Sequence, residues 1–589
     1  MRTYSAACCA LAIAACGGGG SGDSASTTPP APPLAVATSN VSQGQAPLAV
    51  SFNASGSSDP QGYALTYAWS FSDGSTATGV TASHAFQNHG TYSATVAVSD
   101  GHNTTTSNAI QIDVQAAPPS VSAISIGVNV IGVAPTSMQG SISGIDRENL
   151  PLTYTIATTP TAGSATVDAD TGAITYTVPG YTTSATDSFT VNVTNGFAAA
   201  TGNVSVTLNS DPLLPNQWHI QNVGQNTFST TLPVSGNDMN VTGAWTSGFS
   251  GKGIKVGVVD SGLEAAHEDL AANVDLPHSF NFLTNTSDPT PTASGEDHGT
   301  QVAGIIGAVA FNGKGGRGVA YNVTLRGYNL LAAGAFSVSN MAKAMGSDPV
   351  SSDNDLFNAS FSAAGPSGAN ALPSFSAAYQ SITANAMTLR GGLGSAIVNA
   401  GGNEFVDFSP SVGSCGYAQT YGVSCGDPAT DERRGGDYPI VVGALNAAGV
   451  HSSYSTTGSS LWISAPGGEY GSDSSVIPPQ FFSQLGDPVN AVQPAIITTA
   501  HTGCSNALQA FFNQTPPVSM NMLDDQGANP LAAQCQYTAQ MNGTSSATPN
   551  TSAVVAMMLE ANPQLSVRDV KYILAKTAKR VDPNFTGVS

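Results

Sequence analysis

The chain has 589 residues, a formal net charge of −21 and only 9% charged side chains. A chain of this length is expected to form about three or four domains, and its 41% hydrophobic residues are enough to build their cores. The excess of acidic side chains repels phosphate, so the composition excludes a nucleic-acid-binding protein. No apolar run reaches the ~18 residues of a membrane-spanning helix, so contact with a membrane would need an attached lipid.

The first residues form a short leader in which Arg2 precedes a small apolar stretch that ends at Cys16, before four glycines. This segment resembles a bacterial lipoprotein signal, in which the closing cysteine is acylated. We therefore expect residues 1–15 to be a signal peptide, Cys16 to carry the lipid and residues 16–33 to form a flexible linker. The expected location is the outer membrane or cell surface; plain secretion with an incidental Cys16 is the alternative.

Two stretches of alternating apolar and polar residues follow, which is typical of short antiparallel strands. In residues 34–115, the segments 67–74 (YAWSFSDG) and 90–92 resemble hallmarks of PKD domains, so we expect a β-sandwich with Trp69 in its core. Residues 116–209 are similar to a cadherin-like or other immunoglobulin-like repeat and predict a second β-sandwich. Neither module carries catalytic chemistry, so each is expected to act as a spacer or to bind a surface polymer or protein.

After residue 211 the pattern changes to apolar runs alternating with helical stretches. The runs are 254–259, 396–400 and 439–445, and the helical stretches are 298–310 and 547–561. This alternation predicts an α/β domain with a mostly parallel sheet covered on both faces.

Three polar residues stand where such a sheet gathers its active sites. Asp260 ends an apolar strand, His298 begins one helix, and Ser545 lies at the start of another. A helix N-terminus favours negative charge on an attacking oxygen. The chain order Asp, His, Ser is one of the known orders of a serine-hydrolase triad.

The sequences around these residues resemble the three signatures of subtilisin-like serine proteases, namely 258–262 (VVDSG), 298–304 (HGTQVAG) and 543–549 (GTSSATP). The segments 217–219 and 238–245 are similar to the kexin/furin branch. The implied fold is two N-terminal all-β sandwiches followed by an α/β subtilisin-like catalytic domain over 210–589. Because relatives continue with another helix and a further domain, we expect this domain to be incomplete at its C-terminal end.

The resemblance assigns roles that chemistry supports. Ser545 would attack the scissile carbonyl, His298 would take and return its proton, and Asp260 would hold the imidazole. The family pattern places the reactive serine directly after Gly-Thr, so Ser546 is not the expected nucleophile. Asn403, in the segment AGGNE, matches the side chain that donates to the oxyanion; a turn asparagine is the alternative.

The resemblance also implies a structural calcium, with carboxylate, amide and main-chain oxygens as its ligands. The positions that match are Asp238, Asp269 and Asn312 through side chains, and Val309, Lys314 and Gly316 through carbonyls. An ordinary capped loop without a metal is the alternative.

Specificity departs from the furin pattern. Ser360, Phe361 and Ser362 match the strand that pairs with the substrate backbone. The acidic residues that follow it in furin are replaced here by 363–366 (AAGP). Asp407, Asp427, Asp431, Glu432 and Asp437 could line an acidic pocket from another loop, although a solvated acidic loop is the alternative. Cleavage after dibasic pairs is therefore not implied.

Four cysteines lie outside the leader, and four cysteines allow three pairings. For an exported protein we expect the two local disulfides, Cys415–Cys425 and Cys504–Cys535. A zinc site is the rival interpretation, but no Cys-x-x-Cys accompanies them.

The predicted function is a serine endopeptidase that hydrolyses protein or peptide substrates through an acyl-enzyme and is tethered to the cell envelope. No inhibitory propeptide is recognisable between the leader and the β modules. The alternatives are an adhesin-like binding protein with a catalytically silent hydrolase domain, and a scaffold pseudoenzyme.

Overall fold

The computed structural model describes residues 29–132, 135–180, 185–292, 296–361, 377–405, 424–478, 487–504, 519–525 and 528–581. The chain divides into two compact units. The first contains residues up to 121 together with 144–153 and 192–200, and the second contains the rest, including the catalytic domain.

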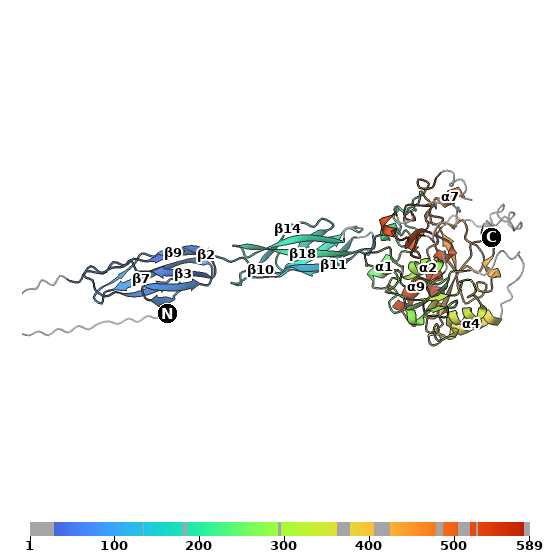
Figure 1. Cartoon of the computed structure of the whole chain (residues 1–589), viewed down its shortest axis with the longest axis horizontal. Helices are drawn as coiled ribbons and strands as arrows, with labels where there is room; N and C mark the ends of the chain where they lie inside the picture. The colour runs from blue at the N-terminus through green and yellow to red at the C-terminus, as the bar shows by residue number, and fades with distance from the viewer. Residues whose placement is uncertain are drawn as a thin grey trace, which may run out of the picture. The chain divides into compact units, whose positions relative to one another are not determined.

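The first β module is built of two sheets (Figure 1). Its core contains aromatic side chains. Trp69, Phe52 and Phe86 are at most 1% exposed, which confirms Trp69 as a core residue. The sheets have the strand orders β1-β3-β6 and β2-β9-β7-β4-β5, with β8 on β7. The strands are β1 (Thr38–Ser39), β2 (Gln43–Gln45), β3 (Leu48–Asn53), β4 (Thr66–Phe71), β5 (Thr76–Thr78), β6 (Thr81–Phe86), β7 (Gly90–Ser99), β8 (Thr104–Thr106) and β9 (Ile110–Gln115).

The second β module is also built from short strands, with Tyr176, Phe189 and Ile174 buried among them. Its strand orders are β11-β18-β17-β14, β12-β16-β15 and the pair β10-β13. The strands are β10 (Ser120–Val121), β11 (Ile124–Asn129), β12 (Thr136–Ser141), β13 (Gly144–Ile145), β14 (Thr153–Thr158), β15 (Ser164–Val167), β16 (Ala173–Val178), β17 (Thr186–Thr194) and β18 (Ala199–Asn209).

The catalytic domain is built on a seven-stranded sheet with the order β20-β21-β19-β22-β23-β24-β25. Every neighbouring pair is parallel, as the continuous apolar runs predict for strands buried on both faces. The strands are β19 (Lys255–Asp260), β20 (Phe280–Asn281), β21 (Thr324–Asn329), β22 (Leu356–Ala359), β23 (Ala396–Ala400), β24 (Ile440–Leu445) and β25 (Ile463–Pro466). A separate antiparallel pair is formed by β26 (Ile496–Thr499) and β27 (Tyr537–Met541).

Helices cover both faces of this sheet. The helices are α1 (Thr242–Thr246), α2 (His298–Gly307), α3 (Val338–Ala342), α4 (Ala377–Thr388), α7 (Pro488–Ala491), α9 (Thr544–Ala561) and α10 (Val567–Thr577). Short helical turns are η1 (Leu214–Asn216), η2 (Leu276–His278), η3 (Lys343–Ser347), η4 (Arg390–Gly392), η5 (Pro428–Thr430) and η6 (Pro530–Ala532). No helix of the described ranges is both long and apolar enough to cross a bilayer.

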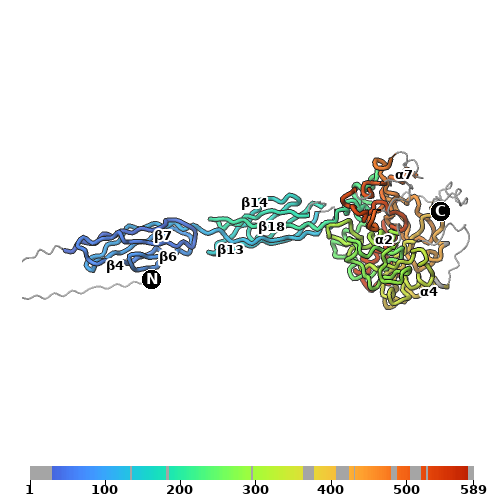
Figure 2. Tube along the Cα trace, viewed as in Figure 1, coloured from blue at the N-terminus to red at the C-terminus, as the bar shows by residue number. Residues whose placement is uncertain are grey.

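Two hydrophobic clusters reflect these layers. The larger joins one face of the sheet to α2, α9 and α10, and the smaller joins the other face to α3 and α4. Although some 240 residues separate their starting points, α2 and α9 pack against each other (Figures 1 and 2). This contact brings the beginnings of two distant segments to one region of the domain.

Two helix ends differ from expectation by three residues: α2 ends at Gly307 and not at 310, and α9 starts early. The helix begins at Thr544, before the predicted position 547, because Gly543 has φ 98° and lets the chain turn into the helix there. Ser545 therefore lies in the first helical turn, and Pro549 lies inside the helix and not in its first turn.

Candidate active site

The predicted catalytic and substrate residues gather at the carboxyl edge of the parallel sheet. Asp260 is the last residue of β19, Ser360 and Phe361 directly follow β22, and Asn403 follows β23. Parallel strands end at the same edge, so residues distant in the sequence meet there. Ser362 lies outside the described residues.

Asp260 and His298 are joined by a hydrogen bond. The distance from His298 Nδ1 to Asp260 Oδ1 is 2.7 Å, and the same oxygen accepts from the backbone N–H of Ser261 at 2.7 Å. The Asp260 side chain is fully buried, whereas that of His298 is 39% exposed. A Cβ on Gly299 would lie 1.9 Å from the carbonyl oxygen of Gly262, so only glycine lets α2 start this close to the β19 turn.

The surroundings of His298 favour its charged form. Burial lowers the pKa of the imidazole, but the charge and hydrogen bond of Asp260, followed by the charge of Asp297, raise it above the usual histidine value. An imidazole is the side chain best suited to both accept and return a proton.

Ser545 and Ser360 hold each other through a pair of reciprocal hydrogen bonds. Ser545 Oγ donates to the carbonyl of Ser360 at 2.9 Å, and Ser360 Oγ donates to the carbonyl of Ser545 at 2.9 Å. The second bond has a local cause: Pro549, four residues along α9, has no N–H to offer the Ser545 carbonyl. Although both are described, Ser545 and His298 share no hydrogen bond in this structure.

Ser546 is excluded as the reactive hydroxyl by its environment. Its side chain is fully buried, and its Oγ bonds to the carbonyls of Gly467 and Gly543, both at 2.8 Å. Ser545 is only half-buried. The structure thus gives Ser546 a packing role and leaves Ser545 at the mouth of the helix.

Asn403 is oriented as an amide donor. Its Oδ1 accepts from the backbone N–H of Thr544 at 2.8 Å and from Thr544 Oγ1 at 2.9 Å. The other end of the amide faces the start of α9: a Cβ on Gly543 would lie 3.0 Å from Asn403 Nδ2 and 3.4 Å from the backbone nitrogen of Ser545. The Asn403 amide nitrogen and the Ser545 backbone nitrogen therefore both lie close to one point beside Gly543.

Among the described acidic residues considered for a basic-substrate pocket, Asp431 is already paired with arginine side chains. Both oxygens of Asp431 bind the guanidinium of Arg433, at 3.0 and 2.5 Å, and Arg434 lies 3.5 Å away. Arg433 also lies over the ring of Phe361, 5.2 Å from its centroid. Asp427 caps η5, Asp437 lines a cavity elsewhere, and Asp407 lies outside the described residues.

Four residues of the expected calcium site lie together. Asn312 Nδ2 donates to Asp269 Oδ1 at 2.7 Å, the Val309 N–H donates to the Asp269 carbonyl at 2.8 Å, and the Lys314 N–H donates to Asn312 Oδ1 at 2.9 Å. Asp269 Oδ2 is buried without a partner. Burial raises the pKa of Asp269 to about 8, and the charges of Asp211 and Glu268 add to this effect, although the Asn312 hydrogen bond opposes it.

Asp238 does not belong to this group, which corrects the expected ligand set. Its Oδ2 accepts from the Asn222 N–H at 2.7 Å and its Oδ1 from the Asn240 N–H at 2.8 Å, on a different loop. Asp211 lies beside the group instead, where its Oδ1 accepts from the Asn312 N–H at 3.2 Å. The sequence signal for Asp211 was only its place just before the Gln-Trp-His segment. Gly316 contacts Gln217.

The cysteines agree with the expected disulfides where they are described. Cys504 and Cys535 are bonded, with their Cα atoms 5.1 Å apart. Cys425 is also disulfide-bonded, and its predicted partner Cys415 lies outside the described residues, as does Cys16.

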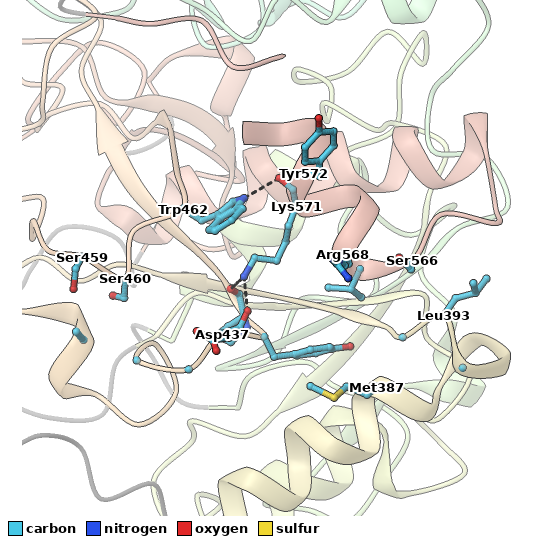
Figure 3. Close-up of a pocket in the computed structure, with 18 residues that line it drawn as sticks. Met387, Leu393, Asp437, Ser459, Ser460, Trp462, Ser566, Arg568, Lys571 and Tyr572 are labelled. Atoms are coloured by element: carbon cyan, nitrogen blue, oxygen red, sulfur yellow. Dashed lines mark hydrogen bonds between the residues drawn. The ribbon is translucent and has the colours of Figure 1, made fainter. Parts of the chain in front are cut away.

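A large cavity of about 830 Å³ lies away from these residues, at the amino edge of β23, β24 and β25 (Figure 3). It runs between α10 and the segments that precede these strands. Lys571 reaches across it to the main-chain carbonyls of Asp437 and Pro439, at 2.6 and 3.1 Å, and lies 4.3 Å from the ring of Trp462. No acid–imidazole–hydroxyl set is among its lining residues, so size alone does not mark the active site.

Comparison with known proteins agrees with this geometry. Residues 251–588 match the model of the subtilase family, more than half of the chain. The chain belongs to the subtilase family. Residues 28–114 match the PKD domain model and residues 118–207 the bacterial Ig domain model, in agreement with the two predicted β modules.

The chain is similar to an extracellular serine protease of Aeromonas sobria, with 38% identity over 383 residues that cover 63% of this chain and 55% of that protein. It is 29% identical to furin-like protease 2 of Drosophila melanogaster over 63% of this chain and 18% of that one. A crystal structure of the serine protease of Aeromonas sobria superposes with a TM-score of 0.54 and 35% identity, over 64% of this chain and 58% of the other. The chain thus spans little more than half of these bacterial relatives.

Proposed function

We propose that this protein is a serine endopeptidase that cleaves protein or peptide substrates through an acyl-enzyme. The observation that carries the proposal is the 2.7 Å bond from His298 to the buried Asp260, at the same sheet edge as Ser545 in the first turn of α9. An imidazole held by a carboxylate beside a hydroxyl at a helix N-terminus is the arrangement that acyl transfer needs.

In this proposal Ser545 leaves the carbonyl of Ser360 and gives its proton to His298 as it attacks the substrate carbonyl. Asp260 stabilises the imidazolium that forms. Asn403 Nδ2 and the Ser545 N–H donate to the oxyanion, and His298 then returns the proton to the leaving amine. Water enters by the same route to release the acyl group.

The substrate backbone would add to the edge at Ser360, Phe361 and Ser362. A preference for dibasic sites is not part of the proposal, since Arg433 and Arg434 neutralise Asp431 beside Phe361.

The test is covalent labelling by a fluorophosphonate, followed by peptide mass mapping. Labelling of Ser545 in the wild-type chain, its loss in Ser545→Ala and its retention in Ser546→Ala would support the proposal. A correctly folded wild-type chain that neither reacts nor cleaves denatured protein would contradict it and favour the binding-protein alternative. A cleavage profile on a peptide library would then define the substrate class.

We also propose that a calcium ion joins Asp269, Asn312 and the carbonyls of Val309, Lys314 and Gly316, with Asp211 in place of Asp238. The buried, unpartnered Asp269 Oδ2 supports this, because oxygen ligands of this kind suit a hard cation. The ion would stabilise the loop that follows α2. Calcium should raise the melting temperature of chelator-treated protein, and Asp269→Ala should abolish that rise. A metal-free chain that melts at the same temperature with and without calcium would contradict the site.

We further propose that the protein is exported and anchored through a lipid on Cys16, with the β modules free to bind a surface polymer or protein. A related protein is named an extracellular serine protease, which supports export. Labelled palmitate should enter the wild-type chain and not Cys16→Ser. Unlabelled wild-type protein in the medium would favour plain secretion.

A further inference from the structure

Arg317 is a completely buried cation in the loop between α2 and β21. Its Nε donates to Asp211 Oδ2 at 2.7 Å, and its Nη2 lies 2.7 Å from the same oxygen. The guanidinium also lies 4.2 Å from the centroid of the Phe311 ring. These contacts satisfy one side of the group from within the catalytic domain.

The other side is satisfied by the second β module. Nη2 donates to the carbonyl of Val130 at 2.9 Å, and Nη1 donates to that of Ile131 at 3.3 Å. Both residues directly follow β11 and belong to the same compact unit as the catalytic domain. A segment of the β module thus provides the acceptors that complete the burial of a catalytic-domain arginine.

Ile131 and Gly132 also pack closely against the catalytic domain. Ile131 packs against its main hydrophobic cluster. Gly132 approaches Gln221 so closely that a Cβ would lie 2.6 Å from Gln221 Oε1. A side chain at 132 would therefore have to displace the Gln221 side chain, and one as large as leucine would also crowd Thr242, whose Cγ2 lies 3.5 Å from the Cβ position.

Burial makes these acceptors costly to lose. A guanidinium out of water must have its donors paired, because an unpaired buried charge is strongly destabilising. If residues 130–132 moved away, Arg317 would keep Asp211 and lose two carbonyls. A lysine could not replace it, because an ammonium cannot reach three separate acceptors with a planar fork.

The same loop leads back to α2. The N–H groups of Gly318, Val319 and Ala320 donate to the carbonyls of Ala308, Ile305 and Ile306 at 2.9, 3.0 and 2.9 Å. Ile305 and Ile306 lie in the last turn of α2, the helix that begins at His298, and Ala308 directly follows it. A displacement of Arg317 is therefore transmitted to the element that carries the imidazole.

We propose that residues 130–132 of the second β module are a built-in part of the catalytic domain and that Arg317, as a positioning residue, uses them to hold α2 and His298. The module is then a support for the active site as well as a spacer. The effect on catalysis rests on the proposed peptidase function, whereas the effect on α2 does not.

The experiment uses the full chain and three variants, Arg317→Lys, Gly132→Leu and Ile131→Ala. Amide hydrogen exchange is measured in a Ser545→Ala background to avoid autolysis, and kcat and KM are measured with Ser545 present. We expect faster exchange in α2 and residues 308–320, with kcat about tenfold lower and KM changed less than about twofold. A purely structural role would lower the melting temperature and leave kcat unchanged.

Arg390→Lys is the matched control, because Arg390 also donates to main-chain carbonyls, those of Leu565 and Pro563, but far from α2 in the chain. It should lower the melting temperature and leave kcat and α2 exchange unchanged. The proposal is overturned if Gly132→Leu and Ile131→Ala keep wild-type exchange and kcat, even if Arg317→Lys fails to fold. Altered exchange in a chain without peptidase activity would uphold the contact and reject only the proposed function.

Discussion

The two edges of the catalytic sheet differ in how their polar groups are used. At the amino edge, an 830 Å³ cavity is lined by Trp462, Lys571 and Asp437, yet Lys571 is engaged by main-chain carbonyls. At the carboxyl edge, His298 is held on one side by Asp260 and remains 39% exposed on the other. The two edges therefore differ in that the acid–base group at the carboxyl edge keeps one side exposed, whereas the cation at the amino edge is bonded to main-chain carbonyls.

The difference follows from the direction of the strands. Helices α2 and α9 begin at the carboxyl edge, so their N-terminal N–H groups face it. Helix α10 begins at the amino edge, and its N-terminus is closed by the capping box of Ser566 and Asp569. Helix N-termini that point toward one edge favour negative charge there.

The strongest test of this contrast is Ser545→Ala. We expect peptidase activity to fall roughly 10⁴-fold or more, since triad members act as a unit. The measurement is kcat/KM on a protein substrate. Ser546→Ala, which removes two structural hydrogen bonds, should lower the melting temperature and keep most activity. The reverse outcome would show that Ser546 is the nucleophile.

The next largest effect is expected for Asn403→Ala. Loss of one oxyanion donor should lower kcat about 10²- to 10³-fold with little change in KM. Lys571→Met at the amino edge is the control and should change only the melting temperature. If Lys571→Met lowered kcat as much as Asn403→Ala, the contrast between the two edges would fail.

Ser360→Ala should have a smaller effect, mainly on stability. It removes the donor to the Ser545 carbonyl, which Pro549 cannot replace, at a cost of about 1–3 kcal/mol in the free energy of unfolding. The double variant Ser360→Ala/Pro549→Ala restores a helical N–H and should recover part of that loss. Denaturant unfolding of the single and double variants measures the coupling. If the changes in the free energy of unfolding caused by the two substitutions simply add, the Ser360 hydroxyl and the N–H at position 549 do not compete for the Ser545 carbonyl.

The smallest effect is expected for Asp297→Asn, read from the pH profile. The charge of Asp297 raises the pKa of His298, so its removal should lower that pKa. His298 acts as a base when neutral, and the acid limb of kcat/KM should therefore move to lower pH while the plateau stays the same. Asp288 lies on an exposed turn and is not among the groups that shift the pKa of His298. Asp288→Asn should therefore leave the acid limb of the pH profile unchanged. An unmoved limb in Asp297→Asn would show that this charge is screened.

The sequence already contained the catalytic core. Apolar runs buried on both faces predicted β19, β23 and β24 within one or two residues, because continuous apolar strands need little tertiary information. The motifs around Asp260, His298 and Ser545 predicted the residues found at the carboxyl edge, and local cysteine spacing predicted Cys504–Cys535.

Other features depended on contacts that no local pattern records. The carboxylate that bonds to the backbone N–H of Asn312 is Asp211, which lies 101 residues earlier in the chain, and not Asp238. The Ser360 hydroxyl donates to the carbonyl of Ser545, which lies 185 residues further along the chain. That carbonyl is open to it because Pro549 has no N–H. The bond from Arg317 to Val130 spans 187 residues and two modules. Sequence periodicity shows which face of a helix or strand is buried. Only the folded chain decides which buried polar groups bond to each other, because every buried donor or acceptor must pair with a group that packing brings close to it.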